Sequence, residues 1–405
     1  MKLSILPFLR NLDKIVAKIG VLFSLILIIF PGLVMDRFFF ILAGVLTLIS
    51  CLLWLTFSKG HTLKNHFPES RIQTTLCAIC FFGLFALSIL SIYFRQELYE
   101  RPLIYFILTT LMAGAIAWQV TTSSRRHIGL ILSQIIILGA SIAWSQLLIS
   151  PSLVGIDPWY HSSLVNQVID NGSIPGGYSY SKLPLFQLMV ASTSILTGFP
   201  YKFSVMLSVS LGQIICNALF TFLIADHLFK NCRIGLLAAL MVIIADYHIR
   251  KSLISTPNAF AVIFILIIIY LLFSRTKDVR DGGHSLFKDI LILLLMATVI
   301  LTHSLAAACM AIILFVFWGA NFFYKIIHSQ IINRFALLIP LSYTITMLVW
   351  WNYAGYLERL GSIMGRIFSA SYFSTIPAEA DNYITHVPVS EQIFNELGMF
   401  IFFLL

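Results

Sequence analysis

The residues best suited to chemistry lie in one polar stretch, Gly155-Ile-Asp-Pro-Trp-Tyr-His161, which directly follows a long apolar segment. A carboxylate placed like that of Asp157 can act as a general base, and a positioned proton acceptor typically accelerates a reaction roughly 10²- to 10⁴-fold. Pro158 restricts Asp157 to an extended backbone and suits the first turn of a helix. The Asp157 carboxylate would therefore sit at or near a helix N-terminus with a fixed direction.

A structural interpretation of the same stretch also stays open. Apolar residues at helical spacing after His161 predict a short amphipathic helix, and Asp157 could simply cap it. Trp159 and Tyr160 would then be aromatic anchors at a membrane surface. The helix is predicted from Leu164, Val165, Val168 and Ile169.

Two further groups supply cationic or titratable side chains. His248, Arg250 and Lys251 follow an apolar run, and His303 separates two others. The first group could bind a phosphate, or its two long side chains could extend from a span end toward water. An ionisable residue at membrane depth is a functional candidate, but a histidine in an ordinary tight turn fits His303 equally well.

Composition defines the setting of these residues. The 405-residue chain is 59% hydrophobic and 11% charged, whereas soluble domains carry about 25% charged residues. This excludes DNA-binding, secreted disulfide-rich and disordered classes and indicates an integral membrane protein. The net charge of +9 indicates orientation in a membrane and not a nucleic-acid partner. The six cysteines lie in or beside apolar segments, so no disulfide framework is expected.

Apolar runs of near-spanning length, about 20 residues, predict an all-α polytopic bundle of about 11 spans plus a partial last one. With the N-terminus in the cytoplasm, most Lys and Arg residues fall inside, provided that Leu183 to Gly198 does not cross. The run from Met399 to Leu405 is too short to span, so we expect the chain to be a fragment. The predicted spans are 19–34, 38–57, 72–94, 103–120, 128–149, 203–227, 234–245, 258–273, 290–302, 304–323 and 335–350.

The loop beginning at Gly155 resembles the first outer loop of the GT-C superfamily, the polytopic glycosyltransferases that use polyprenyl-phosphate-linked sugars. The resemblance includes the Asp157-Pro-Trp motif, the turn 171–177, and a helix that ends at Leu196-Thr-Gly-Phe-Pro200. It covers residues 128–323 and implies a catalytic region over 128–405, possibly cut short at its end. Residues 1–127 would be a four-helix transmembrane addition.

The stretch from Ala245 to Phe260 resembles the second outer loop of oligosaccharyltransferases, which belong to this superfamily. There the family places acidic metal ligands, but Thr256-Pro-Asn258 supplies no carboxylate, and Gly155 stands where those enzymes have a second acid. The resemblance therefore implies a Mn²⁺ or Mg²⁺ cofactor that this sequence does not clearly support. Asp157 and Asp246 are the weak candidates for metal ligands.

The resemblance implies an inverting hexosyl transfer from a polyprenyl or dolichyl phosphate to a protein, lipid or glycan acceptor, on the outer face of a membrane, with the plasma membrane favoured. Asp157 would be the base. His248, Arg250 and Lys251 would bind the phosphate, and His161 and His303 would bind the phosphate or the acceptor.

Two alternatives remain. A transporter or flippase of a lipid-linked or anionic solute would also use basic residues at broken helices, but the acid lies in a long loop and no internal repeat is visible. A polysaccharide polymerase or ligase would share the polyprenyl donor without this loop pattern.

Overall fold

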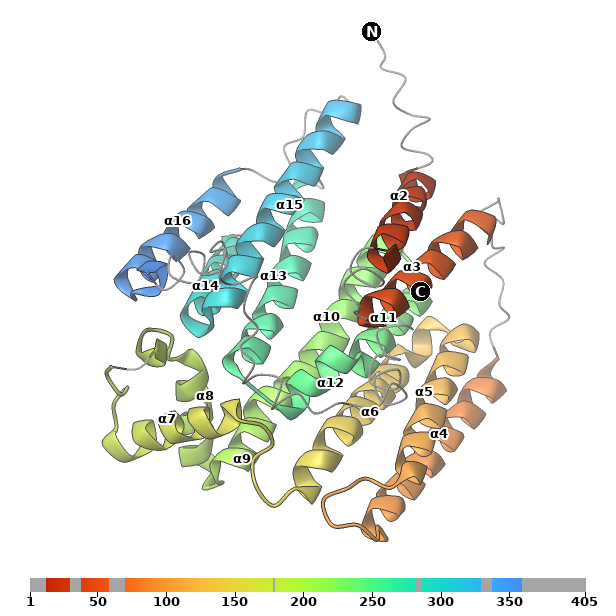
Figure 1. Ribbon diagram of the computed structural model, residues 1–405, viewed down its shortest axis with the longest axis horizontal. Coiled ribbons are helices and arrows are strands. Elements are labelled where there is room, and N and C mark those ends of the chain that lie inside the picture. The colour runs from red at the N-terminus through yellow and green to blue at the C-terminus, as the bar shows by residue number, and fades with distance from the viewer. Residues whose placement is uncertain are drawn as a thin grey trace. The chain divides into compact units, whose positions relative to one another are not determined.

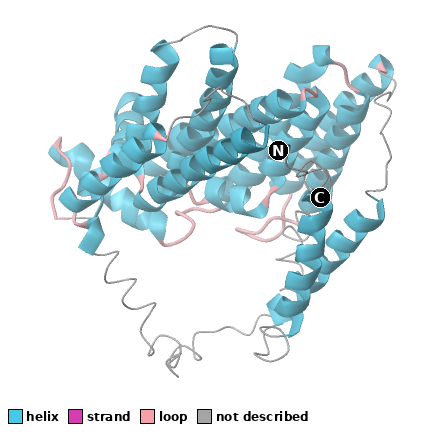
Figure 2. Cartoon of the chain, turned by 90° about the horizontal axis from the view of Figure 1, so that it is seen from above, coloured by secondary structure: helices cyan, strands magenta, loops and turns pink. Residues whose placement is uncertain are grey.

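The computed structural model describes residues 12–29, 38–57, 70–177, 179–280, 286–328 and 337–358, and they contain helices and no strand, as Figure 2 shows. The all-α prediction is confirmed for these residues. The helices, labelled in Figure 1, are α2 (Leu12–Leu27), α3 (Phe38–Phe57), α4 (Arg71–Tyr93), α5 (Leu103–Thr122), α6 (Ile128–Ile149), α7 (Asp157–Asn171), α8 (Leu185–Thr197), α9 (Tyr201–Val205), α10 (Leu211–Phe229), α11 (Cys232–Ile244), α12 (Asp246–Leu253), α13 (Pro257–Arg280), α14 (Leu286–Thr302), α15 (Ser304–His328) and α16 (Leu338–Tyr353).

The chain forms two compact units. In the first, α2 packs against α3, and the backbones approach closely at Gly44, where an added Cβ would lie 2.9 Å from the carbonyl oxygen of Ser24. Small residues allow such close approach between apolar helices. The second unit contains the helices from α4 onward, so α4 and α5 share a unit with the predicted catalytic region.

Six described helices are long and apolar enough to cross a membrane: 71–93, 103–122, 125–149, 201–229, 257–274 and 304–323. A seventh forms if α11 and α12, which meet at a 57° bend, count as one span. These helices indicate a multi-pass membrane protein. The prediction of about eleven spans is supported only in part, because α14 and α16 have 17 and 16 residues. The predicted spans 19–34 and 335–350 and the segment 399–405 lie partly or wholly outside the described residues.

Two apolar cores hold the second unit together. One joins α4, α5, α6, α10 and α11, and its fully buried residues include Phe81, Met112 and Leu236. The other joins α13, α14, α15 and α16 around Met310 and Tyr343. Burial of a large apolar side chain stabilises a fold by about 1.5–3 kcal/mol in water. Within a bilayer, the closeness of the packing has to supply more of this stabilisation.

Helix ends meet in two groups at opposite ends of these helices. At the end predicted to be cytoplasmic, called the inner end, the Ser70 amide donates to the Thr122 carbonyl over 3.2 Å. At the end predicted to face outward, called the outer end, the Lys202 ammonium donates to the Ser150 carbonyl, and Arg101 donates to the Ile142 carbonyl over 3.2 Å. This alternation agrees with the predicted order of cytoplasmic and outer loops.

The helices α7 and α8 form a small layer at the outer end, at the lower left of Figure 1. They pack on α9 and α13 through a third cluster that includes Val165, Phe186 and Phe260. The 13 residues of α8 extend about 20 Å, well short of the roughly 30 Å of a bilayer core. This length fits the prediction that residues 183–198 do not cross.

Replacing Gly235 by alanine tests the close contact between α10 and α11. The new Cβ would lie 2.9 Å from both the carbonyl oxygen and the ring carbon Cδ2 of Phe222. Because a backbone oxygen moves only with its helix, we expect Gly235→Ala to lower the free energy of unfolding by about 1–3 kcal/mol. Thermal unfolding in detergent measures the change. Gly114→Ala, with nothing within 4 Å of its new Cβ, is the control, and an unchanged Tm in Gly235→Ala would contradict this packing.

Candidate outer-face site

Asp157 is the first residue of α7 and is exposed to solvent. The N-cap position belongs to Ile156, which makes no side-chain capping hydrogen bond, and Pro158 lies in the first turn as predicted. No hydrogen bond joins the Asp157 carboxylate to any described residue, so the capping interpretation gains no support. The carboxylate is available to a bound molecule.

His161 lies one turn further along α7 and is buried, with 3% of its surface exposed. Its ring centroid lies 5.0 Å from that of Tyr180 and 5.3 Å from that of Phe186. Burial lowers the pKa of His161 to about 4, and the opposing effect of the Asp157 charge is smaller. Gln187 Nε2 lies 3.5 Å from Nδ1. If the Gln187 amide nitrogen donates across this contact, the neutral ring carries its proton on Nε2.

Tyr180 stands between the two candidate histidines. It belongs to the short helix η3 (Ser179–Lys182), and its ring centroid lies 6.4 Å from that of His303. Burial raises the pKa of Tyr180 to about 12, and Tyr356, Tyr160 and Asp157 add to this effect. The phenol therefore remains protonated and can donate a hydrogen bond. Sequence reasoning missed Tyr180, because one more tyrosine in an aromatic-rich loop gives no distinct signal.

His303 occupies the turn between α14 and α15. Its Nδ1 accepts a hydrogen bond from the Ala306 amide over 3.3 Å, which caps α15. Burial, together with the positive charge of Lys251, lowers the pKa of His303 to about 4. The neutral ring thus carries its proton on Nε2 and can donate it to a ligand. The tight-turn and functional interpretations of His303 are compatible.

The helix α12 carries the predicted phosphate-binding group. Arg250 is exposed, Lys251 is half-buried, and His248 is buried and hydrogen-bonded to the Ile243 backbone. His248 therefore lies within the protein, whereas the two cations are accessible. Lys251 Nζ lies 5.5 Å from the ring centroid of Tyr247, a cation–π contact.

A chain of two hydrogen bonds, called the polar relay, fixes α12 against its neighbours. Residues Met206–Ser210 (η4) form a π-helical turn between α9 and α10, a feature that often marks functional positions. Within it, Ser210 Oγ donates to the Ser252 carbonyl over 2.9 Å and accepts from Trp144 Nε1 over 3.1 Å. The relay ties α12 to α6 at the outer end. Neither the π-helical turn nor the relay has a signature in the sequence.

The donor set does not fit a divalent metal. Among the described residues, no three His, Cys, Asp or Glu side chains gather in a group that could hold a metal ion. Asp246 lies in the first turn of α12 and is exposed. Asn258 Nδ2 lies 3.5 Å from the Tyr247 hydroxyl, so the amide that stands where the family places an acid contacts a tyrosine. Mn²⁺ and Mg²⁺ prefer several oxygen ligands.

The end of α16 also reaches this surface. Lys182 Nζ donates to the Tyr353 hydroxyl over 3.0 Å, and Trp350 Nε1 donates to the Lys182 carbonyl over 3.0 Å.

Beside Tyr180, a cavity between α7 and α8 measures only about 10 Å³, about the size of one water. This cavity is too small for an organic ligand, so the accessible groups of this region lie on its open surface.

The chain matches no protein-family model, no curated protein and no solved structure. The functional assignment rests on the residues themselves. Of the predicted site residues, the charges of Asp157 and His303 act on His161, and the charge of Lys251 acts on His303. Arg250 lies next to Lys251 on α12, and His248 faces the interior.

Substitution of His161 tests the buried neutral histidine. Between pH 6.5 and about 4, the two pKa values of His161, the unfolded chain binds a proton that the folded chain does not. Stability is therefore complete above pH 6.5 and decreases as the pH falls toward 4, by up to roughly 3 kcal/mol from this group. We expect His161→Gln to flatten the dependence of Tm on pH over this range. Equal slopes in wild type and His161→Gln would contradict the buried placement.

Proposed function

We propose that this protein is a membrane glycosyltransferase of GT-C type, with about eleven spans, that transfers a sugar from a polyprenyl-phosphate-linked donor to an acceptor on the non-cytoplasmic face. The observation that carries the proposal is the convergence of an exposed carboxylate, two neutral histidines and a cation from α7, α12 and the α14–α15 turn. The charge effects of Asp157 and His303 on His161, and of Lys251 on His303, connect the four groups. These effects support a site in which Asp157 would be the base and Lys251 would bind the phosphate.

The reaction needs a base for the acceptor. The Asp157 carboxylate takes the proton from an acceptor hydroxyl or amide as the acceptor atom attacks the anomeric carbon. The bond from this carbon to the phosphate oxygen breaks, and its electron pair leaves with the polyprenyl phosphate. Because the attack is a single displacement, the configuration at the anomeric carbon inverts.

The leaving phosphate needs compensating charge and hydrogen-bond donors. Arg250 and Lys251 supply positive charge on α12, and Arg250 can also form paired hydrogen bonds with phosphate oxygens. The Nε2–H of His303 and the hydroxyl of Tyr180 are neutral donors between α12 and Asp157. No step in this scheme uses a metal.

The lipid part of the donor needs an apolar surface next to the site. On α8 and just after it, Ile195 and Leu196 are exposed by 65% and 86%, and Phe199 by 46%. A short helix with such exposed apolar side chains suits a position at the membrane interface. A polyprenyl chain can therefore lie along α8 while its phosphate reaches α12.

The assay compares consumption of polyprenyl-phosphate hexoses by membranes containing wild type or Asp157→Asn at matched protein levels. We expect Asp157→Asn to lower the rate by roughly 10²- to 10⁴-fold, because the base is lost. Asp170→Asn removes an exposed carboxylate at the other end of α7 and should keep the wild-type rate. Equal rates for wild type and Asp157→Asn would remove Asp157 from the site. Transport of the lipid-linked sugar without any consumption would favour the transporter or flippase.

The phosphate-binding role of α12 has its own test. We expect Lys251→Gln to lower the rate about tenfold or more, since a charge-assisted hydrogen bond typically contributes 1.5–3 kcal/mol. Lys251→Arg should retain most of the activity, because it keeps the charge. If Lys251→Gln and wild type have equal rates with every donor, α12 does not bind the phosphate.

Addition of EDTA should leave the wild-type rate unchanged, and a large loss would show that a metal is needed.

A further inference from the structure

A second hollow lies at the inner end, far along α6 from the proposed transferase site. It has a volume of about 760 Å³ and lies where α4 begins, α5 ends and α6 begins. Its lining is almost wholly basic and hydroxylic: Ser70, Arg71, Thr122, Ser124, Arg125, Arg126 and His127. We call it the basic hollow.

Backbone hydrogen bonds build the floor of the basic hollow. The Ser70 amide donates to the Thr122 carbonyl over 3.2 Å, which joins the start of α4 to the end of α5. The short helix η2 (Arg125–His127) then turns the chain into α6. Ser124 Oγ lies 3.1 Å from His127 Nδ1 and holds this turn. The arginines therefore project from a fixed frame.

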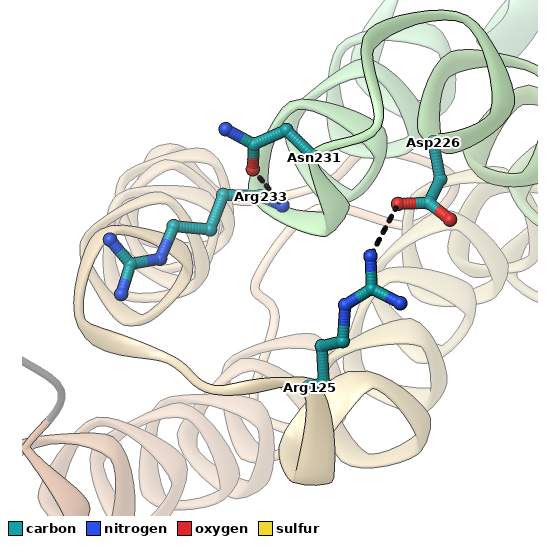
Figure 3. Close-up of polar contacts among 4 residues, drawn as sticks. All are labelled: Arg125, Asp226, Asn231 and Arg233. Atoms are coloured by element: carbon teal, nitrogen blue, oxygen red, sulfur yellow. Dashed lines mark hydrogen bonds and ion pairs between the residues drawn. The ribbon is translucent and has the colours of Figure 1, made fainter. Parts of the chain in front are cut away.

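Arg233 supports the frame from the start of α11. Its Nε donates to the carbonyl of buried Ser123 over 3.1 Å. Figure 3 shows its guanidinium extended away from Asn231, whose side chain accepts a hydrogen bond from the Arg233 amide over 3.0 Å. Arg233 thus fixes the chain just before η2.

The positive charge of the basic hollow is only weakly compensated. Figure 3 shows the Arg125 side chain pointing toward Asp226. The two charged groups are 3.9 Å apart, and the Arg125 side chain is 71% exposed. An exposed pair at this distance contributes little. Arg71 and Arg126 have no ion pair within the described part of the chain. Within the described residues, three guanidinium groups therefore line the hollow with one distant carboxylate nearby.

The predicted cytoplasmic location of the basic hollow indicates which anions are close to it. The bias of Lys and Arg assigns this end to the cytoplasm, where anionic lipids give the leaflet a negative surface potential and basic pockets between helices bind phosphate head groups. On α4, directly after Arg71, Ile72 and Leu76 are exposed by 74% and 59%. An acyl chain can lie against these side chains while its head group occupies the hollow.

We infer that the basic hollow binds the phosphate head group of an anionic phospholipid from the cytoplasmic leaflet. The planar guanidinium groups of Arg71 and Arg126 form paired hydrogen bonds with phosphate oxygens. The hydroxyls of Ser70 and Ser124 border the same space. This site is separate from the proposed transferase surface and holds a lipid whether or not that proposal is correct.

The test uses the full chain in detergent and measures binding of short-chain phosphatidylglycerol by native mass spectrometry. Short-chain phosphatidylcholine with the same acyl chains is the neutral comparison. We expect wild type to prefer phosphatidylglycerol, and the double variant Arg71→Gln, Arg126→Gln to bind it about tenfold or more weakly, because two charge-assisted contacts are lost. The double variant with Lys at both positions should bind more tightly than the Gln variant.

Lys230→Asn is the matched control. It removes a positive charge from the same end, outside the hollow, and asparagine suits the left-handed backbone there, where φ is +55°. It should leave binding unchanged. Equal affinity for the two lipids, equal binding by wild type and the Gln variant, or an equal loss in Lys230→Asn would overturn the site. Displacement of the lipid by an equal concentration of inorganic phosphate would assign the hollow to a soluble anion and overturn the lipid assignment.

Discussion

Every backbone N–H and C=O in the bilayer core must be bonded within its own segment, and this requirement places the chemistry of the protein at helix ends. Only at the two ends can loops, turns and short helices expose polar groups to water. The candidate transferase residues gather at the outer end around Asp157 and His303, and the basic hollow lies at the inner end. The long helices act as spacers that hold the two ends apart.

The positions of the helix ends alone do not align the candidate site residues at the outer end. Three local features contribute to that alignment. The 57° bend between α11 and α12 sets the direction of the short helix that carries Lys251, whose charge acts on His303. The π-helical turn places Ser210 between Trp144 and Ser252, which fixes α12 against α6. The cap that His303 Nδ1 provides for α15 sets the orientation of its ring. Each of these features lies where a helix bends, widens or begins.

The sequence predicts the broad architecture because apolar runs and charge bias follow directly from the bilayer. It predicts the amphipathic helix after Asp157, in which Leu164, Val165 and Val168 are indeed buried. It also identifies Asp157, His161 and His303 as candidates before any geometry is known. Its span count exceeds what the described helices support, because an apolar run such as 290–302 reveals composition and not whether its helix is long enough to cross.

The remaining features depend on contacts between distant parts of the chain, which no local pattern encodes. Tyr180 matters because it lies between His161 and His303, and Lys182 because it contacts Tyr353 far along the chain. Likewise, the positive-inside bias explains why Arg71, Arg125 and Arg126 lie at one end, but not why they line one hollow. That arrangement requires the Ser70–Thr122 backbone contact and the Arg233–Ser123 hydrogen bond. The basic residues that set the orientation of the helices in the membrane thus form a binding surface only where helix packing brings them together.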